Sequence, residues 1–151
     1  NIYIMTLDEL KAQWALDCEI DDIELDNASL EVPKLHAKYQ DQLTNKLLTL
    51  KNWEFKYDEL LKDKWLWYNG KMDSDRIKEL GWADDPFDGL KIMKSDMQFF
   101  YNSDSDLREI KAKIEYLKIT INFLKDCMQN ITWRHQTIKN TIDWRKFMAG
   151  Q

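Results

Sequence analysis

The sequence predicts a mainly α-helical fold built on two long helices. Apolar residues recur at steps of three or four positions along residues 33–69 and again along residues 106–147, which is the spacing of one helix face. The chain has 151 residues, of which 44% are hydrophobic and 13% aromatic, so it can bury a core and is short enough for one domain. We therefore expect a single helical domain over residues 1–151.

A short helix is expected near the amino end. Thr6 and Glu9 have the spacing of a capping box, and Met5 and Leu10 are placed to form a hydrophobic staple beside it. These features predict a helix over residues 7–16.

A long helix is predicted over residues 33–69. Pro33 suits the first turn of a helix, and apolar and aromatic residues then recur on one face until Asn69 and Gly70. The next segment, residues 71–104, has no long periodic run and is expected to form an irregular connector.

The connector contains shorter signals. A helical piece is expected around Arg76–Leu80, followed by the turn-rich stretch Asp84–Gly89. Residues 90–101 fit either a small β-hairpin or a helix, because short apolar runs do not distinguish the two. We favour the hairpin.

The strongest pattern lies in residues 106–147, where Asp106 is a candidate N-cap and Glu109 follows three residues later. The apolar stripe is roughly 54 Å long at about 1.5 Å per residue, more than a domain of this size is expected to cover. We therefore expect a coiled-coil-like seam of a homo-oligomer, with His135 buried in it and fixing the register. The predicted seam consists of Leu107, Ile110, Ile114, Leu117, Ile121, Leu124, Met128, Ile131, His135, Ile138 and Ile142.

Charge is distributed unevenly. Residues 1–106 carry 13 Lys and Arg against 23 Asp and Glu, residues 107–151 carry 9 against 4, and the net charge is -5. Five of these acidic residues fall within residues 19–27, which we expect to form a solvated linker. The cations of the last helix flank the predicted seam, where they could pair with acidic residues of the same or a neighbouring subunit or bind phosphates. They are Lys111, Lys113, Lys118, Lys125, Arg134 and Lys139.

Catalytic and metal signatures are missing. The four glycines fit neither a GxxxxGK[ST] loop nor GxGxxG, and no Cys/His spacing or HExxH motif supports zinc. Asp84–Asp88 has Pro86 where a calcium loop needs an oxygen ligand, which favours a plain turn. We predict no catalytic residue, no metal, no cofactor and no enzymatic activity, and interpret Cys18 and Cys127 as structural thiols.

Membrane and export signals are also missing. No apolar run approaches the roughly 18 residues that a membrane span requires. The opening residues 1–5 lack the charged region and apolar core of a signal peptide. We expect an intracellular protein with no membrane association.

One segment could bind nucleic acid. Residues 61–71 interleave lysines with aromatics at a predicted helix end, and ammonium groups can contact phosphates while aromatic faces stack on unpaired bases. Alternatively, Trp65 and Tyr68 continue the core face and the lysines are solvated. The candidate residues are Lys62, Lys64, Trp65, Tyr68 and Lys71.

This segment resembles the UvsY family of recombination mediators from T-even-like bacteriophages, whose members carry a Leu-basic-x-basic run followed by aromatics and a glycine. Here the run is Leu61–Lys64, followed by Trp67–Gly70. The likeness extends to Met5–Leu10 and to Ile138–Gly150, so it covers most of the chain.

The resemblance implies a non-enzymatic helical subunit that assembles into a ring of six or seven and binds single-stranded DNA in DNA recombination and repair. Its implied task is to help a RecA-like (UvsX-type) recombinase displace the phage single-strand binding protein, in the cytoplasm of the infected bacterial host. It also implies that Lys62 and Lys64 contact the DNA. The rival hypothesis is a coiled-coil structural or assembly protein of a phage with no DNA role, for which the helix over residues 106–147 would suffice.

Overall fold

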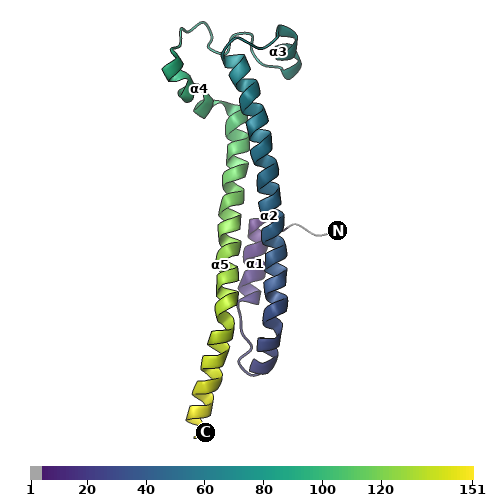
Figure 1. Ribbon diagram of the computed structural model, residues 1–151, viewed down its shortest axis with the longest axis vertical. Helices are drawn as coiled ribbons and strands as arrows, with labels where there is room; N and C mark the ends of the chain where they lie inside the picture. The colour runs from purple at the N-terminus through teal and green to yellow at the C-terminus, as the bar shows by residue number, and fades with distance from the viewer. Residues whose placement is uncertain (1–4) are drawn as a thin grey trace. The chain divides into compact units, whose positions relative to one another are not determined.

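The computed structural model describes residues 5–151 and is helical, with no β-strand in that range. The chain divides into two compact units. The terminal unit comprises the described residues up to Thr49 together with Leu117–Gln151, and the connector unit comprises Leu50–Tyr116. The helical segments, labelled in Figure 1 apart from the 3-10 turn η1, are α1 (Leu7–Asp17), α2 (Leu25–Tyr68), α3 (Ser74–Leu80), η1 (Lys94–Asp96), α4 (Met97–Ser103) and α5 (Ser105–Met148).

The start of α1 follows the capping box in the sequence. Thr6 has an extended backbone, and its hydroxyl oxygen accepts the Glu9 N–H at 3.2 Å. Met5 packs against the core cluster that contains Leu10, as a hydrophobic staple requires. At the other end, Arg134 donates to the carbonyl of Asp17 at 2.6 Å, so a cation of α5 satisfies an acceptor that the end of α1 leaves free.

Helix α2 begins at Leu25, well before the predicted start at Pro33. Pro33 therefore lies inside the helix, where it leaves the Ser29 carbonyl without its usual N–H partner. Both residues are exposed, so water can hydrate that carbonyl. Leu25 is buried, and the packing of its side chain stabilises this earlier start, which local sequence preference does not predict.

The core of the terminal unit joins α1, α2 and α5. Leu10 and Tyr39 pack against Leu124, Cys127 and Ile131, all nearly inaccessible to solvent. Burial raises the pKa of the Cys127 thiol to about 12, so the thiol stays protonated as a core residue.

Basic residues of α5 in this unit contact the acidic linker. Arg145 donates to the carbonyl of Asp22 and pairs with its carboxylate at 3.3 Å. Arg134 approaches the Glu19 carbonyl at 3.4 Å as well as that of Asp17. Two cations of α5 therefore have partners within the same chain, although the carboxylate pair is exposed and contributes little to stability.

The apolar stripe of α5 is covered within the chain, which corrects the expectation that another subunit must cover it. Seven of its eleven positions are buried, and in the terminal unit Leu124 and Ile131 pack against Tyr39 of α2. His135 is exposed, with Nδ1 2.6 Å from the Thr132 carbonyl oxygen, so it fixes no register between buried helices. The buried positions are Leu107, Ile114, Leu117, Ile121, Leu124, Ile131 and Ile138, while Ile110, Met128 and Ile142 are half-buried.

The connector contains short helical segments in place of the predicted hairpin. Residues 90–101 contain η1 and most of α4, so the hairpin prediction was wrong. Met97, Phe100 and Tyr101 are partly buried while Gln98 and Phe99 are exposed, which is the spacing of a helix face. The apolar run was too short for its period to separate the two structures.

The stretch Asp84–Asp88 forms a turn, as its sequence indicates. The carboxylate of Asp85 accepts the Phe87 N–H at 2.9 Å and the Gly89 N–H at 2.6 Å. Those two backbone hydrogen bonds hold the pKa of Asp85 below its ordinary value. Among residues 5–151, no group of three or more His, Cys, Asp or Glu side chains is arranged to hold a metal ion.

No helix in the described part of the chain combines the length and apolarity needed to cross a bilayer. The prediction that the opening residues form no signal peptide falls almost wholly on residues 1–4, which lie outside the described residues.

Candidate nucleic-acid interface

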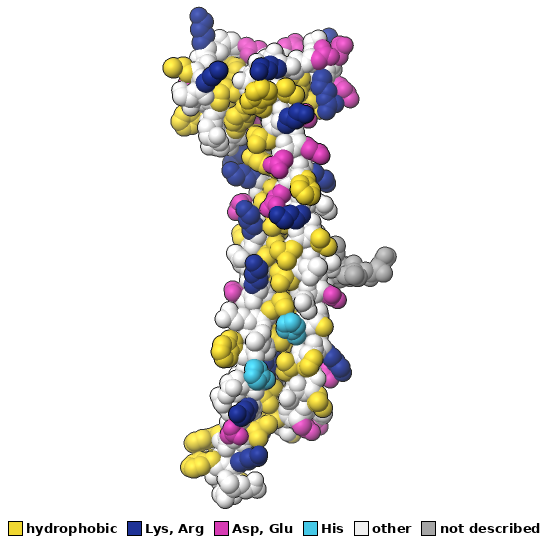
Figure 2. All heavy atoms as spheres, in the orientation of Figure 1, with side chains coloured by type: hydrophobic (Ala, Val, Ile, Leu, Met, Phe, Trp, Pro, Cys, Tyr) yellow, Lys and Arg dark blue, Asp and Glu magenta, His cyan; other side chains and the backbone are white. Residues whose placement is uncertain are grey.

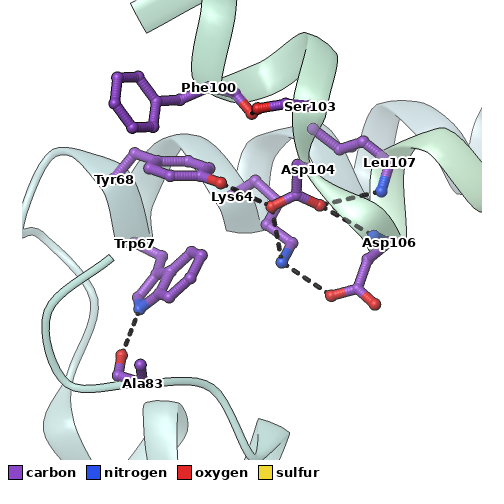
Figure 3. Close-up of polar contacts among 9 residues, drawn as sticks. All are labelled: Lys64, Trp67, Tyr68, Ala83, Phe100, Ser103, Asp104, Asp106 and Leu107. Carbon is purple, nitrogen blue, oxygen red and sulfur yellow. Dashed lines mark hydrogen bonds and ion pairs between the residues drawn. The ribbon is translucent and has the colours of Figure 1, made fainter. Parts of the chain in front are cut away.

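Asp104 organises the connector unit, because four hydrogen-bonding groups converge on its carboxylate (Figure 3). One oxygen accepts the backbone N–H groups of Asp106 and Leu107, each at 3.0 Å. The other accepts the Tyr68 hydroxyl at 2.7 Å and lies 3.0 Å from the ammonium of Lys64. Asp104 is thus the N-cap of α5, and the prediction that Asp106 caps this helix was wrong.

Lys64 lies inside this network. Its side chain is 3% exposed, and its ammonium is 2.8 Å from Asp106 as well as 3.0 Å from Asp104. The same ammonium lies over two indole rings, 3.9 Å from the centroid of Trp82 and 4.7 Å from that of Trp67. A phosphate cannot reach Lys64 without displacing these partners, so the expectation that Lys64 contacts DNA is corrected.

Tyr68 is also a core residue. Its side chain is buried, and its ring lies 5.5–6.2 Å from those of Phe87, Phe100 and Tyr101. The structure therefore favours the alternative in which Tyr68 continues the core face of α2. Its hydroxyl is occupied by Asp104 and its ring by other aromatics, so it cannot stack on a base.

The surroundings of Tyr68 and Asp104 determine the protonation state of each side chain. Burial and the hydrogen bond to Asp104 both raise the pKa of the Tyr68 hydroxyl, which therefore remains a donor. Burial alone would raise the pKa of Asp104, but hydrogen bonds from Leu107, Tyr68 and Lys64 outweigh it and hold this pKa below its ordinary value. The Asp104 contribution to stability is therefore present at neutral pH and is lost as the pH falls through that lowered pKa.

Lys62 faces away from this network. Residues two apart on a helix are separated by about 200° around its axis, so Lys62 and Lys64 cannot lie on one face of α2. Lys62 is exposed, and Trp65 follows it by three positions on the same side of the helix. The pair Lys62 and Trp65 is therefore accessible to one ligand.

The end of α2 brings a second cation to Trp65. Gly70 has φ of +66°, a left-handed conformation that glycine adopts without strain, and it ends the helix. The next backbone N–H, that of Lys71, bonds back to the Leu66 carbonyl at 2.8 Å. This turn places the Lys71 ammonium 4.6 Å from the Trp65 ring centroid, while Trp65 remains 43% exposed. We call Lys62, Trp65 and Lys71 the outer face of α2.

Asp63, between the two lysines of the basic run, has its own partner. Its carboxylate lies 3.8 Å from the guanidinium of Arg76, with both side chains partly exposed. The pair is too long and too solvated to contribute much stability. It still places a positive charge beside Asp63, which reduces the repulsion that Asp63 would exert on a phosphate.

The sequence profile for the recombination, repair and ssDNA binding protein UvsY matches residues 13–151. This chain belongs to the UvsY family. Its fold is also that of the recombination mediator protein UvsY of bacteriophage T4. One crystal structure of that protein has a TM-score of 0.83 at 23% identity, covering 96% of this chain and 98% of that chain. A second has a TM-score of 0.79 at 20% identity, covering 95% and 99% respectively. No curated protein sequence matches this chain.

In this UvsY-family chain, the sequence pattern identified some of the accessible residues correctly and missed contacts made by residues far apart in the chain. The alternation of lysines and aromatics found Lys62, Trp65 and Lys71, which the structure leaves exposed or half-exposed. The same alternation could not show that Lys64 is buried, because its partner Asp104 lies forty residues away. Trp82 was missed altogether, since nothing in the connector sequence relates its ring to Lys64.

Substitution of Lys62 and of Lys64, the two lysines of the UvsY-family basic run, should change the free energy of unfolding by unequal amounts. We expect Lys64→Ala to lower the free energy of unfolding by about 3–5 kcal/mol, because it leaves buried Asp104 without its cation. Lys62→Ala is expected to change it by less than about 0.5 kcal/mol, as for most exposed positions. Urea denaturation followed by circular dichroism at neutral pH measures both, and equal effects would contradict the burial of Lys64.

Proposed function

We propose that this UvsY-family chain is a recombination mediator, which binds single-stranded DNA and promotes loading of a RecA-like recombinase in place of the single-strand binding protein. The proposal follows from family membership together with one observation, the exposed outer face of α2. No catalytic step is required of the chain in this role.

The outer face has the chemistry that unpaired DNA needs. Two ammonium groups, from Lys62 and Lys71, are available to phosphates, and the partly open ring of Trp65 is available for stacking on a base. Stacking on an aromatic contributes roughly 1–3 kcal/mol per base and tolerates any base identity. Duplex DNA keeps its bases inside, so we expect a preference for single strands without a preference for sequence.

One outer face is a weak site, which leads us to propose several copies in one assembly. Two phosphate contacts to a single strand give a salt dependence of only about -1.4 in log K against log salt, whereas seven copies would approach -10. Linking the copies also raises the effective concentration of each face for the strand. We therefore propose a homo-oligomeric ring of six or seven subunits.

The surface that would join the subunits is not the apolar stripe of α5, which this chain already covers. Three large apolar side chains near the end of α5 remain uncovered: Trp144 is 62% exposed, Phe147 69% and Met148 67%. Figure 2 shows hydrophobic side chains gathered at this end of the helix. Trp144 and Phe147 stack on each other at 5.7 Å, and exposed apolar patches of this kind are typical of association surfaces.

The proposed partners follow from the same role. They are single-stranded DNA, a RecA-like recombinase and the phage single-strand binding protein, encountered in the cytoplasm of the infected host. A chain that clamps the DNA backbone while leaving base edges free would let a recombinase read the same strand.

DNA binding is tested by fluorescence anisotropy of a labelled single strand at several salt concentrations, with duplex DNA for comparison. We expect single-strand-selective binding that weakens with salt. Lys62→Ala combined with Lys71→Ala should reduce the magnitude of the salt dependence by about 1.4 per bound subunit, because two phosphate contacts are lost. Trp65→Ala should cost roughly 1–3 kcal/mol of binding free energy.

The matched control is Lys91→Ala with Lys94→Ala, which removes the same charge from two exposed positions of the same unit. It should bind as the unmodified chain does. If the unmodified chain binds no single-stranded DNA at low salt, the mediator proposal is wrong and the phage structural protein remains.

The assembly is tested by light scattering coupled to size-exclusion chromatography. We expect six or seven subunits for the unmodified chain, and smaller species for Trp144→Ala combined with Phe147→Ala, because the stacked pair is lost. Phe99→Ala, which removes a 72% exposed ring from α4, should leave the mass unchanged. A monomeric unmodified chain at micromolar concentration would contradict the proposed ring.

A further inference from the structure

The connector unit carries a second group of cations, built around Trp53. The Lys56 ammonium lies 4.4 Å from the centroid of this indole, and the Lys113 ammonium lies 4.4 Å from the same centroid. Lys56 is on α2 and Lys113 is on α5, so the fold brings them together from distant parts of the sequence. We call Trp53, Lys56 and Lys113 the indole clamp.

The positive charge of the clamp is poorly neutralised. Lys56 forms no ion pair with a carboxylate in the described chain, residues 5–151. Lys113 has Glu109 at 3.9 Å, and both side chains are well exposed, so this pair is weak. Each ammonium is 4.4 Å from one point, so the two are at most twice that distance apart and repel each other. An anion bound beside them would relieve this repulsion.

We propose that the indole clamp is a second contact site for the backbone phosphates of single-stranded DNA. This inference rests on the proposed function and adds a site to it. Two cations from separate helices flank a half-buried aromatic, and lysines interleaved with an aromatic are the pattern that suits a phosphate backbone with unpaired bases. Both ammonium groups lie over the indole ring, so the clamp offers charge to phosphates rather than an open ring to a base.

The clamp also distinguishes two cations along the flank of α5, Arg134 and Lys113. Arg134 is already occupied by the carbonyl groups of Asp17 and Glu19. Lys113 instead reaches an aromatic of α2 and has only the distant carboxylate of Glu109. The fold thus turns one lysine of a basic flank into part of a two-helix site.

The clamp and the outer face lie on different sides of α2. Trp53 and Lys62 are nine residues apart, roughly 13.5 Å along the helix axis at about 1.5 Å per residue and about half a turn around it. A strand of about three nucleotides bound at one face is therefore too short to contact the other on the same subunit. A longer strand that passes around the helix can contact both.

The test compares the salt dependence of binding for a short oligonucleotide, of about three nucleotides, with that of a strand several times longer. With the long strand, Lys56→Ala combined with Lys113→Ala should reduce the magnitude of the salt dependence by about 1.4 per bound subunit. With the short strand, which contacts one face at a time, the same double variant should reduce the salt dependence by less. Lys56→Arg with Lys113→Arg should keep the original dependence on both strands.

Two further variants separate the clamp from a general charge effect. Lys111→Ala removes a cation two residues from Lys113 but about 200° around α5, and it should not change the salt dependence. Lys56→Met with Lys113→Met keeps a long unbranched side chain at both positions while removing the charge, so it should reduce the salt dependence as the alanine pair does. Circular dichroism and oligomeric mass verify that each variant is folded and assembled.

Four results would overturn the clamp. An unchanged salt dependence with the long strand, while the Lys62 and Lys71 double variant lowers it, removes the clamp and leaves the proposed function standing. If Lys111→Ala changes the salt dependence as much as the clamp variants do, the change reflects overall charge and not a site. The same conclusion follows if the clamp variants act equally on both strand lengths. If neither pair of lysines alters binding, the clamp and the outer face both fail, whereas the proposed function fails only if the unmodified chain binds no single-stranded DNA.

Discussion

The connector unit depends on the buried ion pair between Lys64 and Asp104. A lysine or a carboxylate removed from water is unstable unless a partner of opposite charge and further hydrogen bonds replace the lost hydration. Here the ammonium and the carboxylate lie 3.0 Å apart, and the carboxylate also accepts hydrogen bonds from Tyr68 and two backbone N–H groups. The positions at which α4 ends and α5 begins follow from that requirement. Replacing such a pair by apolar residues of similar volume is often neutral, whereas removing one partner is strongly destabilising.

This constraint decides which residues can meet a ligand. Because Lys64 faces inward, only the opposite side of α2 can offer cations there, and the helix end at Gly70 returns Lys71 to that side. The resulting site has two cations and one aromatic, too few for tight binding by a single chain. The proposed function would then require several subunits, or additional contacts such as the proposed indole clamp. Either would add phosphate contacts to the same strand.

The sequence could predict those features that depend on local pattern. The helical period of residues 33–69 and 106–147 and the capping box at Thr6 are encoded within a few neighbouring residues, and the structure has both long helices and the cap. It could not predict the burial of Lys64, because a lysine between exposed positions looks solvated until its partner from the far end of the connector is known. For the same reason the stripe of α5 suggested another subunit, whereas α2 of the same chain covers it. Asp104 and Asp106 are both reasonable caps by type, and only the hydrogen bonds that Asp104 accepts from the backbone N–H groups of Asp106 and Leu107 distinguish them.

The mediator role is tested most directly by ATP hydrolysis of a RecA-like recombinase on single-stranded DNA already covered by single-strand binding protein. Hydrolysis begins only as the recombinase gains the strand, so its lag reports loading. We predict that the unmodified chain shortens this lag and that the Lys62→Ala, Lys71→Ala variant does not, although both are folded. A chain that binds single-stranded DNA but leaves the lag unchanged at every concentration would contradict the account, since DNA binding would then serve some purpose other than loading.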